Sequence, residues 1–332
     1  MSTTQPKRHV AIVGIGSYLP ERILTNAELE KMVDTTNEWI VSRSGIRERR
    51  IAREDQATSD LAAEAANRAL AKAALKPEDV DLIIVATLSP DMPFPNTACF
   101  VQKLIGAKNA TCIGLEAACS GFLFAVDAAS QYLLTGRFKT ALVIGAEKLS
   151  TVTDWQDRTT CVLFGDGAGA VVLQVRDSGE GILSTVTGSD GTLNALLNIP
   201  GGGSRNPASV QTIEKRMHFM KMEGKEVFKH AVRAMGEAAR KALEKAGLTI
   251  ADVACVVPHQ ANMRIVEAIR DRLGVGPEKF FINLDKYGNM SAASIPVALD
   301  EAVNEGRIKK GDNIVLVAFG GGFTWGAMVV KM

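Results

Sequence analysis

Three residues far apart in the sequence could carry nucleophilic chemistry: Cys119, His259 and Asn289. They offer a thiol nucleophile, an imidazole and a neutral amide donor, the groups that thioester chemistry needs. An amide suits a reaction that places negative charge on a carbonyl oxygen, because a carboxylate at that position would repel the charge. Each residue also has a simpler structural interpretation: a core cysteine, a structural histidine and a turn asparagine.

Cys119 stands where a predicted strand passes into a buried helix. The segment that follows, up to Leu134, has Ala, Leu and Phe on every face, which is typical of a helix buried nearly all round. Thr135-Gly136 ends this helix, since glycine readily takes the left-handed cap conformation. Unpaired amide groups and the positive end of the helix dipole favour a thiolate at such a position, so we expect a lowered thiol pKa.

His259 follows a second predicted strand, 253–258, which Pro258 ends. Ligands bind at the carboxyl ends of strands in open α/β sheets, so this histidine is well placed to meet a substrate. The remaining histidines fall in polar or helical surroundings and are expected at the surface: His9, His218 and His230.

The chain resembles itself in three places. A motif at 64–75, which overlaps the end of a predicted helix at 58–74, is followed by Asp79-Val80 and a predicted strand at 81–87. It recurs at 237–248, followed by Asp252-Val253 and the strand that ends at Pro258. Similar helix ends follow at 135–139 and 305–309, and their alignment places Cys119 opposite Asn289. Glycine-rich runs at 164–170 and 319–323 form the third pair.

These repeats predict an α/β protein with two similar halves around a pseudo-twofold axis. We expect residues 1–178 to form the half that carries the nucleophile, and residues 179–332 to form the half that carries His259 and Asn289. Helix N-termini that are equivalent in the two halves can then face each other across the axis, so the three residues become neighbours.

Composition narrows the class of protein. The chain has 332 residues, of which 46% are hydrophobic and 23% charged, as in an ordinary soluble globular protein. A formal net charge of +1 gives no global field for nucleic acid or membrane, and no apolar run is long enough to span a bilayer. Five scattered cysteines without metal-ligand spacing indicate free thiols in a reducing compartment, so we expect a cytoplasmic protein without a metal.

Four ordered motifs resemble those of β-ketoacyl-acyl-carrier-protein synthase III, the initiating condensing enzyme of bacterial type II fatty acid synthesis. They are Ala-Ala-Cys-Ser-Gly at 117–121, Pro-His-Gln-Ala-Asn at 258–262, Gly-Asn-Met-Ser-Ala-Ala-Ser at 288–294 and Phe-Gly-Gly-Gly-Phe-Thr-Trp at 319–325. The resemblance implies a thiolase-like fold with two βαβαβ-type halves layered α/β/α/β/α. It also implies condensation of an acyl-coenzyme A primer with malonyl-acyl-carrier protein through an acyl-cysteine, giving 3-ketoacyl-acyl-carrier protein, CO2 and coenzyme A. Coenzyme A enters as a substrate, and no cofactor is implied.

The resemblance also assigns roles to individual residues. Cys119 would accept the acyl group, and His259 and Asn289 would bind the malonyl thioester carbonyl. The backbone amides of Cys119 and Gly321 would form an oxyanion hole. Further residues match positions for coenzyme A (Trp39, Arg43, Arg158 and Asn262), for the acyl pocket (Phe94, which reaches the partner of a homodimer, and Phe164) and for docking of the acidic carrier protein (Lys229, Arg264 and Arg272).

Two departures from the family pattern leave primer choice and carrier contacts open: Leu115-Glu116 before the nucleophile, and Asp271 at the expected docking face. The alternatives are a same-fold acyltransferase or condensing enzyme of specialised, polyketide-like metabolism and, more distantly, a cysteine hydrolase or a non-catalytic acyl-binding module. With a reactive thiolate at Cys119, we expect replacement of His259 or Asn289 to spare acyl transfer and to impair decarboxylation. For His259 an alternative stays open, in which the imidazole lies close to the sulfur and accepts its proton.

Overall fold

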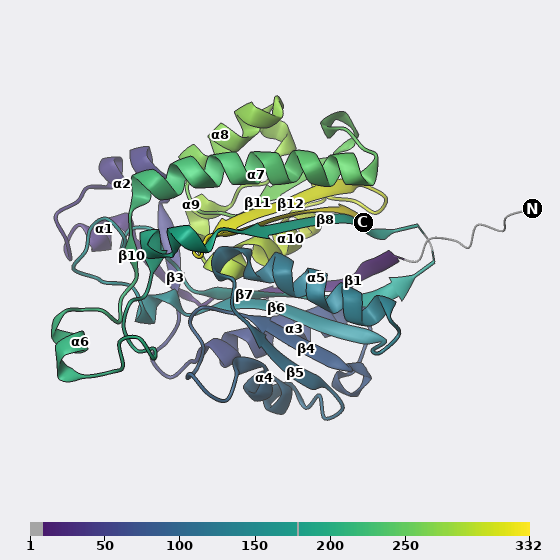
Figure 1. Ribbon diagram of the computed structural model, residues 1–332, viewed down its shortest axis with the longest axis horizontal. Coiled ribbons are helices and arrows are strands. Elements are labelled where there is room, and N and C mark those ends of the chain that lie inside the picture. The colour runs from purple at the N-terminus through teal and green to yellow at the C-terminus, as the bar shows by residue number, and fades with distance from the viewer. Residues whose placement is uncertain (1–8, 178) are drawn as a thin grey trace, which may run out of the picture.

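Two β-sheets form the framework of the computed structural model, which describes residues 9–177 and 179–332 (Figure 1). The first sheet has the strand order β1 (His9–Tyr18), β7 (Gly167–Arg176), β6 (Thr140–Glu147), β4 (Leu82–Ala86) and β5 (Thr111–Leu115). The second has the order β8 (Gly181–Ser189), β13 (Thr324–Lys331), β12 (Asn313–Gly320) and β11 (Cys255–Pro258).

The two sheets repeat one pattern. In the first, β1 and β7 pair antiparallel, as do β7 and β6, whereas β6 and β4 pair parallel. The second sheet has the same sequence of directions from β8 through β13 and β12 to β11. A counterpart of β5 is reduced to a single parallel bridge between Val256 and Phe280. The proposed boundary at 178/179 falls between β7 and β8, and residue 178 itself lies outside the described residues.

Six helices complete the predicted α/β/α/β/α layers (Figure 1). The helices α5 (Gly121–Leu134) and α10 (Ser294–Asn304) lie between the sheets and share one core cluster with both. The outer face of the first sheet is covered by α3 (Thr58–Ala73) and α4 (Thr97–Ile105), and that of the second by α7 (Gly224–Ala246) and α8 (Met263–Leu273).

The sandwich explains why the strands are continuous apolar runs. Along β4, Leu82 and Ile84 face the central helices, whereas Ile83 and Val85 face the outer helices. Successive strand side chains point to opposite faces, so a strand covered on both sides favours apolar residues at successive positions. Full burial of one such side chain contributes about 1.5–3 kcal/mol. The helix and strand predicted at 58–74 and 81–87 are confirmed within two residues at each end.

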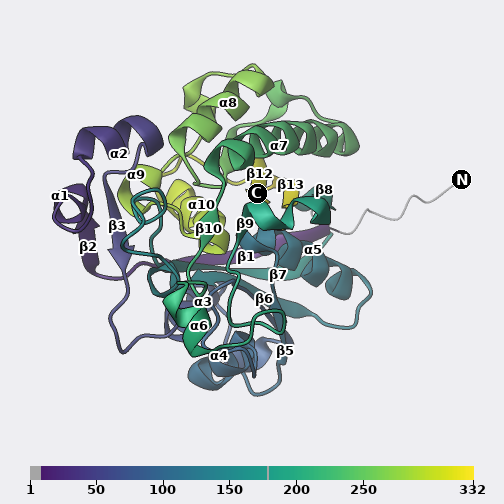
Figure 2. The ribbon, with the colours of Figure 1, turned by 60° about the vertical axis from the view of Figure 1, so that its left-hand side comes forward.

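Shorter elements gather at one side of the sheets, where Figure 2 shows α1 and α2 beside α9. The short strands and helices are β2 (Arg22–Thr25), α1 (Asn26–Leu29), α2 (Asn37–Ser44), β3 (Glu48–Ile51), β9 (Leu197–Asn198), α6 (Val210–Glu214), β10 (Lys221–Met222) and α9 (Leu284–Tyr287). Short 3-10 helices occupy Pro77–Asp79, Ala118–Ser120, Leu149–Thr151, Gly191–Leu196, Ile250–Asp252, Pro277–Lys279 and Ser291–Ala293.

Candidate active site

Cys119 lies in the turn Ala118–Ser120, directly before α5, and is 8% exposed. The preceding residue, Ala118, has a φ of 44°, in the left-handed region that non-glycine residues rarely adopt. Its N–H donates a hydrogen bond of 2.7 Å to Glu116 Oε1, and Thr324 Oγ1 donates to the Ala117 carbonyl at 2.9 Å. These contacts from both sides hold the turn in its strained shape, as is common where a reactive group is positioned.

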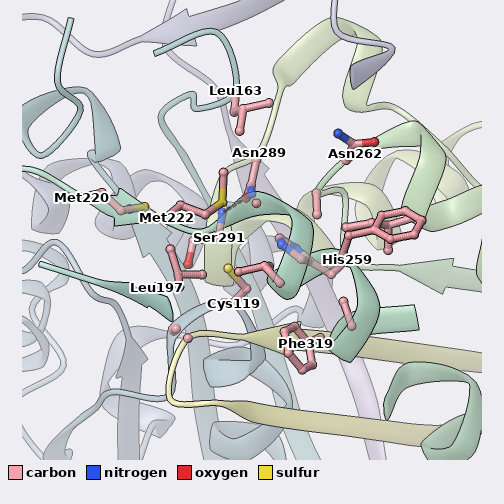
Figure 3. A pocket seen from close by; sticks show the side chains of 18 of the residues that line it. Cys119, Leu163, Leu197, Met220, Met222, His259, Asn262, Asn289, Ser291 and Phe319 are labelled. Atoms are coloured by element: carbon pink, nitrogen blue, oxygen red, sulfur yellow. Dashed lines mark hydrogen bonds between the residues drawn. The ribbon is translucent and has the colours of Figure 1, made fainter. Parts of the chain in front are cut away.

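Asn289 stands before an equivalent turn, Ser291–Ala293, which precedes α10. Ser291 also has a φ of 44°, and its N–H donates to Asn289 Oδ1 at 2.8 Å (Figure 3). Because a backbone N–H can only donate, this bond engages the oxygen of the Asn289 amide and leaves its Nδ2 as a donor. The Asn289 backbone is held in place as well, since its N–H donates to the Leu163 carbonyl at 2.8 Å.

The match of these two turns corrects the predicted alignment of the halves. The counterpart of Cys119 is Ala292, and the counterpart of Asn289 is Glu116, whose side chain likewise accepts the N–H of the residue two positions on. Matching the helix ends misplaced the pair because α10 has 11 residues whereas α5 has 14. The third repeat is also out of register: Phe319 lies inside β12, whereas Phe164 precedes β7.

His259 follows β11, as predicted, and its N–H donates to the Val317 carbonyl at 2.8 Å. The side chain is 2% exposed, and its Nδ1 has no hydrogen-bond partner. Burial lowers the pKa of the His259 imidazole to about 3, because the charged form is costly away from water. The ring is therefore neutral near pH 7, with one nitrogen as donor and one as acceptor.

One cavity of about 1110 Å³ brings Cys119, His259 and Asn289 together. In Figure 3 the His259 ring and the Asn289 amide lie on the side of the cavity towards the Cys119 sulfur. The lining near them is largely apolar and includes Leu163, Phe164, Leu197, Met220, Met222 and Phe319. The convergence predicted from the three motifs is thus found, and the surroundings suit an apolar thioester arm better than a polar substrate.

The thiol differs from expectation in one respect. Burial raises the pKa of the Cys119 thiol to about 12, and the nearby carboxylates of Glu147 and Glu116 act in the same direction. A free thiolate was predicted from the helix N-terminus, but in this enclosed site the neutral thiol is favoured. The neutral imidazole of His259 lines the same cavity as this neutral thiol.

The glycine-rich run after β12 packs directly against the nucleophile. A Cβ on Gly320 would lie 2.6 Å from the Cys119 nitrogen, so only glycine fits at the end of this strand. Gly321 lines the cavity, as expected for a residue that meets the reacting carbonyl. Ser120 Oγ donates to the Thr324 carbonyl at 3.1 Å and ties the turn to β13.

The residues predicted to bind coenzyme A cluster at α2. The guanidinium of Arg158 lies 4.7 Å from the centre of the Trp39 ring, and that of Arg43 lies 5.5 Å from it. Arg158 is also paired with Asp34 at 3.1 Å. Asn262 caps α8 through the Arg264 N–H and donates to the Arg43 carbonyl, so its amide already has structural partners. Trp39, Arg43 and Asn262 line the same cavity as Cys119.

The other predicted contacts are divided between the cavity and the surface. Phe164 is buried in the cavity wall and bridges to Asn289, whereas Phe94 is 85% exposed and lies outside the cavity. Lys229 and Arg264 line the cavity, and Lys229 pairs with Glu226 at 2.6 Å. Arg272 lies at the surface, where its side chain packs beside Gly236 of α7.

Several residues of the site were missed by sequence reasoning. Glu147 ends β6 after the apolar run 141–146 and is fully buried beside Cys119. Its single charge at the end of an apolar run was the available signal. Met220 and Met222 reach the cavity from the segment around β10, and no pattern in the sequence separates them from ordinary core residues.

Within residues 9–177 and 179–332, no group of three or more His, Cys, Asp or Glu side chains could hold a metal ion. All five cysteines are free thiols. No helix in the described part of the chain is long and apolar enough to cross a membrane.

The chain is similar to known proteins in both sequence and structure. Residues 113–191 match the family described as 3-oxoacyl-[acyl-carrier-protein] synthase III, and residues 243–332 match its C-terminal family. The chain is 58% identical over 322 residues to the β-ketoacyl-[acyl-carrier-protein] synthase III of Desulfitobacterium hafniense strain Y51, which covers 97% of both chains.

Solved structures of the same family have the same fold as this chain. The 3-oxoacyl-[acyl-carrier-protein] synthase III of Aquifex aeolicus VF5 superposes with a TM-score of 0.91 at 49% identity, covering 97% of this chain and 100% of that chain. A priming β-ketosynthase from a polyketide biosynthetic pathway has a TM-score of 0.90 at 35% identity, covering 99% of this chain and 98% of that chain.

Proposed function

Because the chain belongs to the β-ketoacyl-acyl-carrier-protein synthase III family, we propose that it joins an acyl-coenzyme A primer to malonyl-acyl-carrier protein and thereby initiates fatty acid synthesis. The products are 3-ketoacyl-acyl-carrier protein, CO2 and coenzyme A. The identity of 58% to a synthase III favours this reaction over specialised metabolism, since the polyketide priming enzyme is 35% identical. Primer length stays open.

The first half-reaction moves the acyl group from coenzyme A to Cys119. As the sulfur attacks the thioester carbonyl, the proton of the neutral thiol passes to the neutral imidazole of His259. The carbonyl oxygen becomes negative and is stabilised by the amides of Cys119 and Gly321. The tetrahedral intermediate then expels coenzyme A as a thiolate, which takes up the proton from His259. One oxyanion donor typically contributes about 2.7–4 kcal/mol to the transition state.

The second half-reaction uses the donors on the other side of the cavity. The malonyl carboxylate leaves as CO2, and the electron pair of the broken C–C bond forms an enolate whose oxygen accepts hydrogen bonds from Asn289 Nδ2 and the His259 N–H. The enolate carbon attacks the acyl carbonyl on Cys119. Collapse of that intermediate releases the Cys119 sulfur, which regains a proton from solvent. Neutral donors suffice for these steps.

The orientation of the Asn289 amide is the observation that carries this proposal. The Ser291 N–H occupies Oδ1, so Asn289 offers its donor to the cavity that holds the nucleophile. A hydrolytic cysteine triad instead needs an acceptor at this position to orient a histidinium. The fixed donor therefore supports a site built for an enolate oxygen.

Residues in and around the cavity support a proposal for the substrates and partners. We propose that the adenine of coenzyme A is held between Trp39 and Arg158, with Arg43 and Asn262 contacting the rest of the molecule. Lys229, Arg264 and Arg272 on α7 and α8 would meet the acidic carrier protein in the cytoplasm. The distance of 4.7 Å between Arg158 and the Trp39 ring leaves no space for a further ring, so we expect Arg158 to move when adenine binds.

We further propose a homodimer in which Phe94 completes the acyl pocket of the partner subunit, since an aromatic ring that is 85% exposed needs a cover. Replacement of Phe94 by alanine should shift primer preference more than it lowers thermal stability. Light scattering on the active enzyme tests the assembly, and an active monomer would contradict it.

The decisive experiment measures both half-reactions. The protein is incubated with short, branched and longer acyl-coenzyme A primers, and intact mass reports the acyl adduct. Labelled malonyl-acyl-carrier protein is then added, and released CO2 and the 3-ketoacyl product are measured. Free acid as the main product would instead identify a hydrolase, and the absence of an adduct with every primer would identify a binding module.

A further inference from the structure

Glu147 is a buried carboxylate that the reaction described above does not use. It ends β6, has no exposed surface, and lies where the two sheets meet the active-site turns. Its carboxylate accepts hydrogen bonds from the hydroxyls of Ser89 and Thr87, at 2.5 and 3.1 Å, and from the Leu88 N–H at 3.2 Å. On the other side the Ala292 N–H approaches Oε1 at 3.4 Å.

The pseudo-twofold symmetry relates Glu147 to a residue beside the nucleophile. The counterpart of β6 is β12, and their last residues, Glu147 and Gly320, occupy the same place in the two halves. Gly320 leaves the amide of Cys119 uncovered, because any side chain there would collide with it. In the other half, the amide of Ala292 is the counterpart of the Cys119 amide, and the Glu147 carboxylate covers it. Of these two equivalent backbone amides, that of Cys119 is thus free to bind a substrate oxygen, whereas that of Ala292 is bound by the protein's own Glu147 carboxylate.

We propose that Glu147 is a positioning residue for the decarboxylation half-reaction. Its carboxylate bridges the 87–89 loop to the turn Ser291–Ala293, whose first N–H holds the Asn289 amide in its donor orientation. The inference rests on the function proposed above, in which Asn289 binds the enolate oxygen. Loss of the bridge lets that donor move, and small displacements of a reacting geometry cost up to about 100-fold in rate.

The same carboxylate acts on the nucleophile. The buried hydroxyl of Ser291 lies close enough to Cys119 and Glu147 to lower the pKa of both, although its Oγ completes no hydrogen bond. The charge of Glu147 raises the pKa of the Cys119 thiol. Other groups that face Glu147 are neutral donors, namely the Thr87 and Ser89 hydroxyls and backbone amides. Burial raises the pKa of Glu147 itself to about 7, so at pH 8 and above it carries its charge.

The test compares Glu147→Gln with Glu147→Asp in the full-length protein. Glutamine keeps the shape and removes the charge and one acceptor, so CO2 release from malonyl-acyl-carrier protein should fall roughly 10- to 100-fold while acyl transfer changes less. With a like charge removed, the pH midpoint of Cys119 alkylation by iodoacetamide should move below that of wild type. Aspartate keeps the charge, so its alkylation midpoint should stay near wild type and part of the CO2 release should return.

Asp300→Asn is the matched control. Asp300 is also a buried carboxylate that accepts hydrogen bonds, from Ser17 and Lys72, but it lies on α10 outside the active-site cavity. Its replacement should lower thermal stability and leave the ratio of the two half-reactions unchanged. The proposal is wrong if Glu147→Gln releases CO2 as fast as wild type, or slows both half-reactions equally with an unshifted alkylation midpoint. If wild type itself releases no CO2, the proposed function fails, whereas the alkylation shift still tests the contact with Cys119.

Discussion

The turns before α5 and α10 have the same backbone shape and opposite chemical roles. In each, the first residue has a φ of 44° and donates its N–H to the side chain two positions earlier. In the first half, that side chain is Glu116, and the nucleophile follows. In the second half it is Asn289, and Ala292 stands where the sulfur would be.

The neighbouring strand ends differ as well. Gly320 exposes the amide of the nucleophile, whereas Glu147 covers the equivalent amide of Ala292. A repeated backbone motif thus supplies two sets of oriented donors, and a few side chains decide which set meets the acyl group and which meets the enolate. Independent use of the two sets implies that substitutions in one turn should affect one half-reaction selectively.

Replacement of Cys119 by serine should have the largest effect. A serine hydroxyl is far less nucleophilic than a thiol, and in this buried site it would scarcely ionise, so no acyl-enzyme should form. Intact mass after incubation with acyl-coenzyme A measures the adduct. Cys99→Ser, at a half-exposed cysteine away from the cavity, should retain a full adduct. A full adduct on the Cys119 variant would remove this residue from its proposed role.

His259→Ala should slow both half-reactions. With the thiol pKa raised to about 12, loss of the proton acceptor should slow acyl transfer by about 100-fold or more, and loss of the N–H donor should slow decarboxylation as well. Labelled acyl-coenzyme A and labelled malonyl-acyl-carrier protein measure the steps separately. Unchanged acyl transfer would mean that Cys119 loses its proton without the imidazole.

Asn289→Asp should slow only the decarboxylation half-reaction. Aspartate keeps the acceptor for the Ser291 N–H and so preserves the turn, but it removes the Nδ2 donor and places a negative charge beside the enolate. CO2 release should fall by about 100-fold, in line with loss of one oxyanion donor, and acyl transfer should persist. Abolished acyl transfer with continuing CO2 release would reverse the proposed roles of the two halves.

Gly320→Ala should act on the nucleophile turn alone. The new Cβ would lie 2.6 Å from the Cys119 nitrogen, so the turn must shift, and acyl transfer should fall by about tenfold. Gly326→Ala in β13 is the control, because its nearest neighbours lie at an ordinary 3.5 Å. Steady-state kinetics with a short acyl-coenzyme A measures acyl transfer by both variants. Equal rates would argue against the need to keep the backbone amide of Cys119 accessible to the substrate.

The smallest effect concerns stability. The pKa of His259 is about 3 when folded and 6.5 in its ordinary state, so between these values the unfolded chain binds more protons. The free energy of unfolding should therefore fall as pH decreases below 6.5, by about 2 kcal/mol between pH 7 and 5. His259→Ala lacks this contribution, and urea unfolding of both proteins at each pH measures the difference. Parallel pH curves would show that the pKa of the imidazole is the same in the folded and the unfolded chain.

Much of this site could be predicted from local pattern. The helix after Cys119 is apolar on every face, the strand before His259 ends at Pro258, and both elements occur at the predicted positions. The repeats predicted two similar α/β halves and the convergence of Cys119, His259 and Asn289, whereas the α/β/α/β/α layers were implied by the family resemblance that the four motifs carry. The helix and the strand depend on short stretches of sequence, whose periodicity reports directly on burial.

Other properties depend on contacts between distant segments. The pairing of Cys119 with Ala292 follows from where two helices of unequal length begin, which is set by packing between the sheets. The role of Glu147 requires donors from residues 87–89 and 292, which no local pattern connects. The pKa of the Cys119 thiol was predicted with the wrong sign, because a helix N-terminus is visible in a sequence whereas the depth of burial and the carboxylates around the sulfur exist only once the halves have packed together.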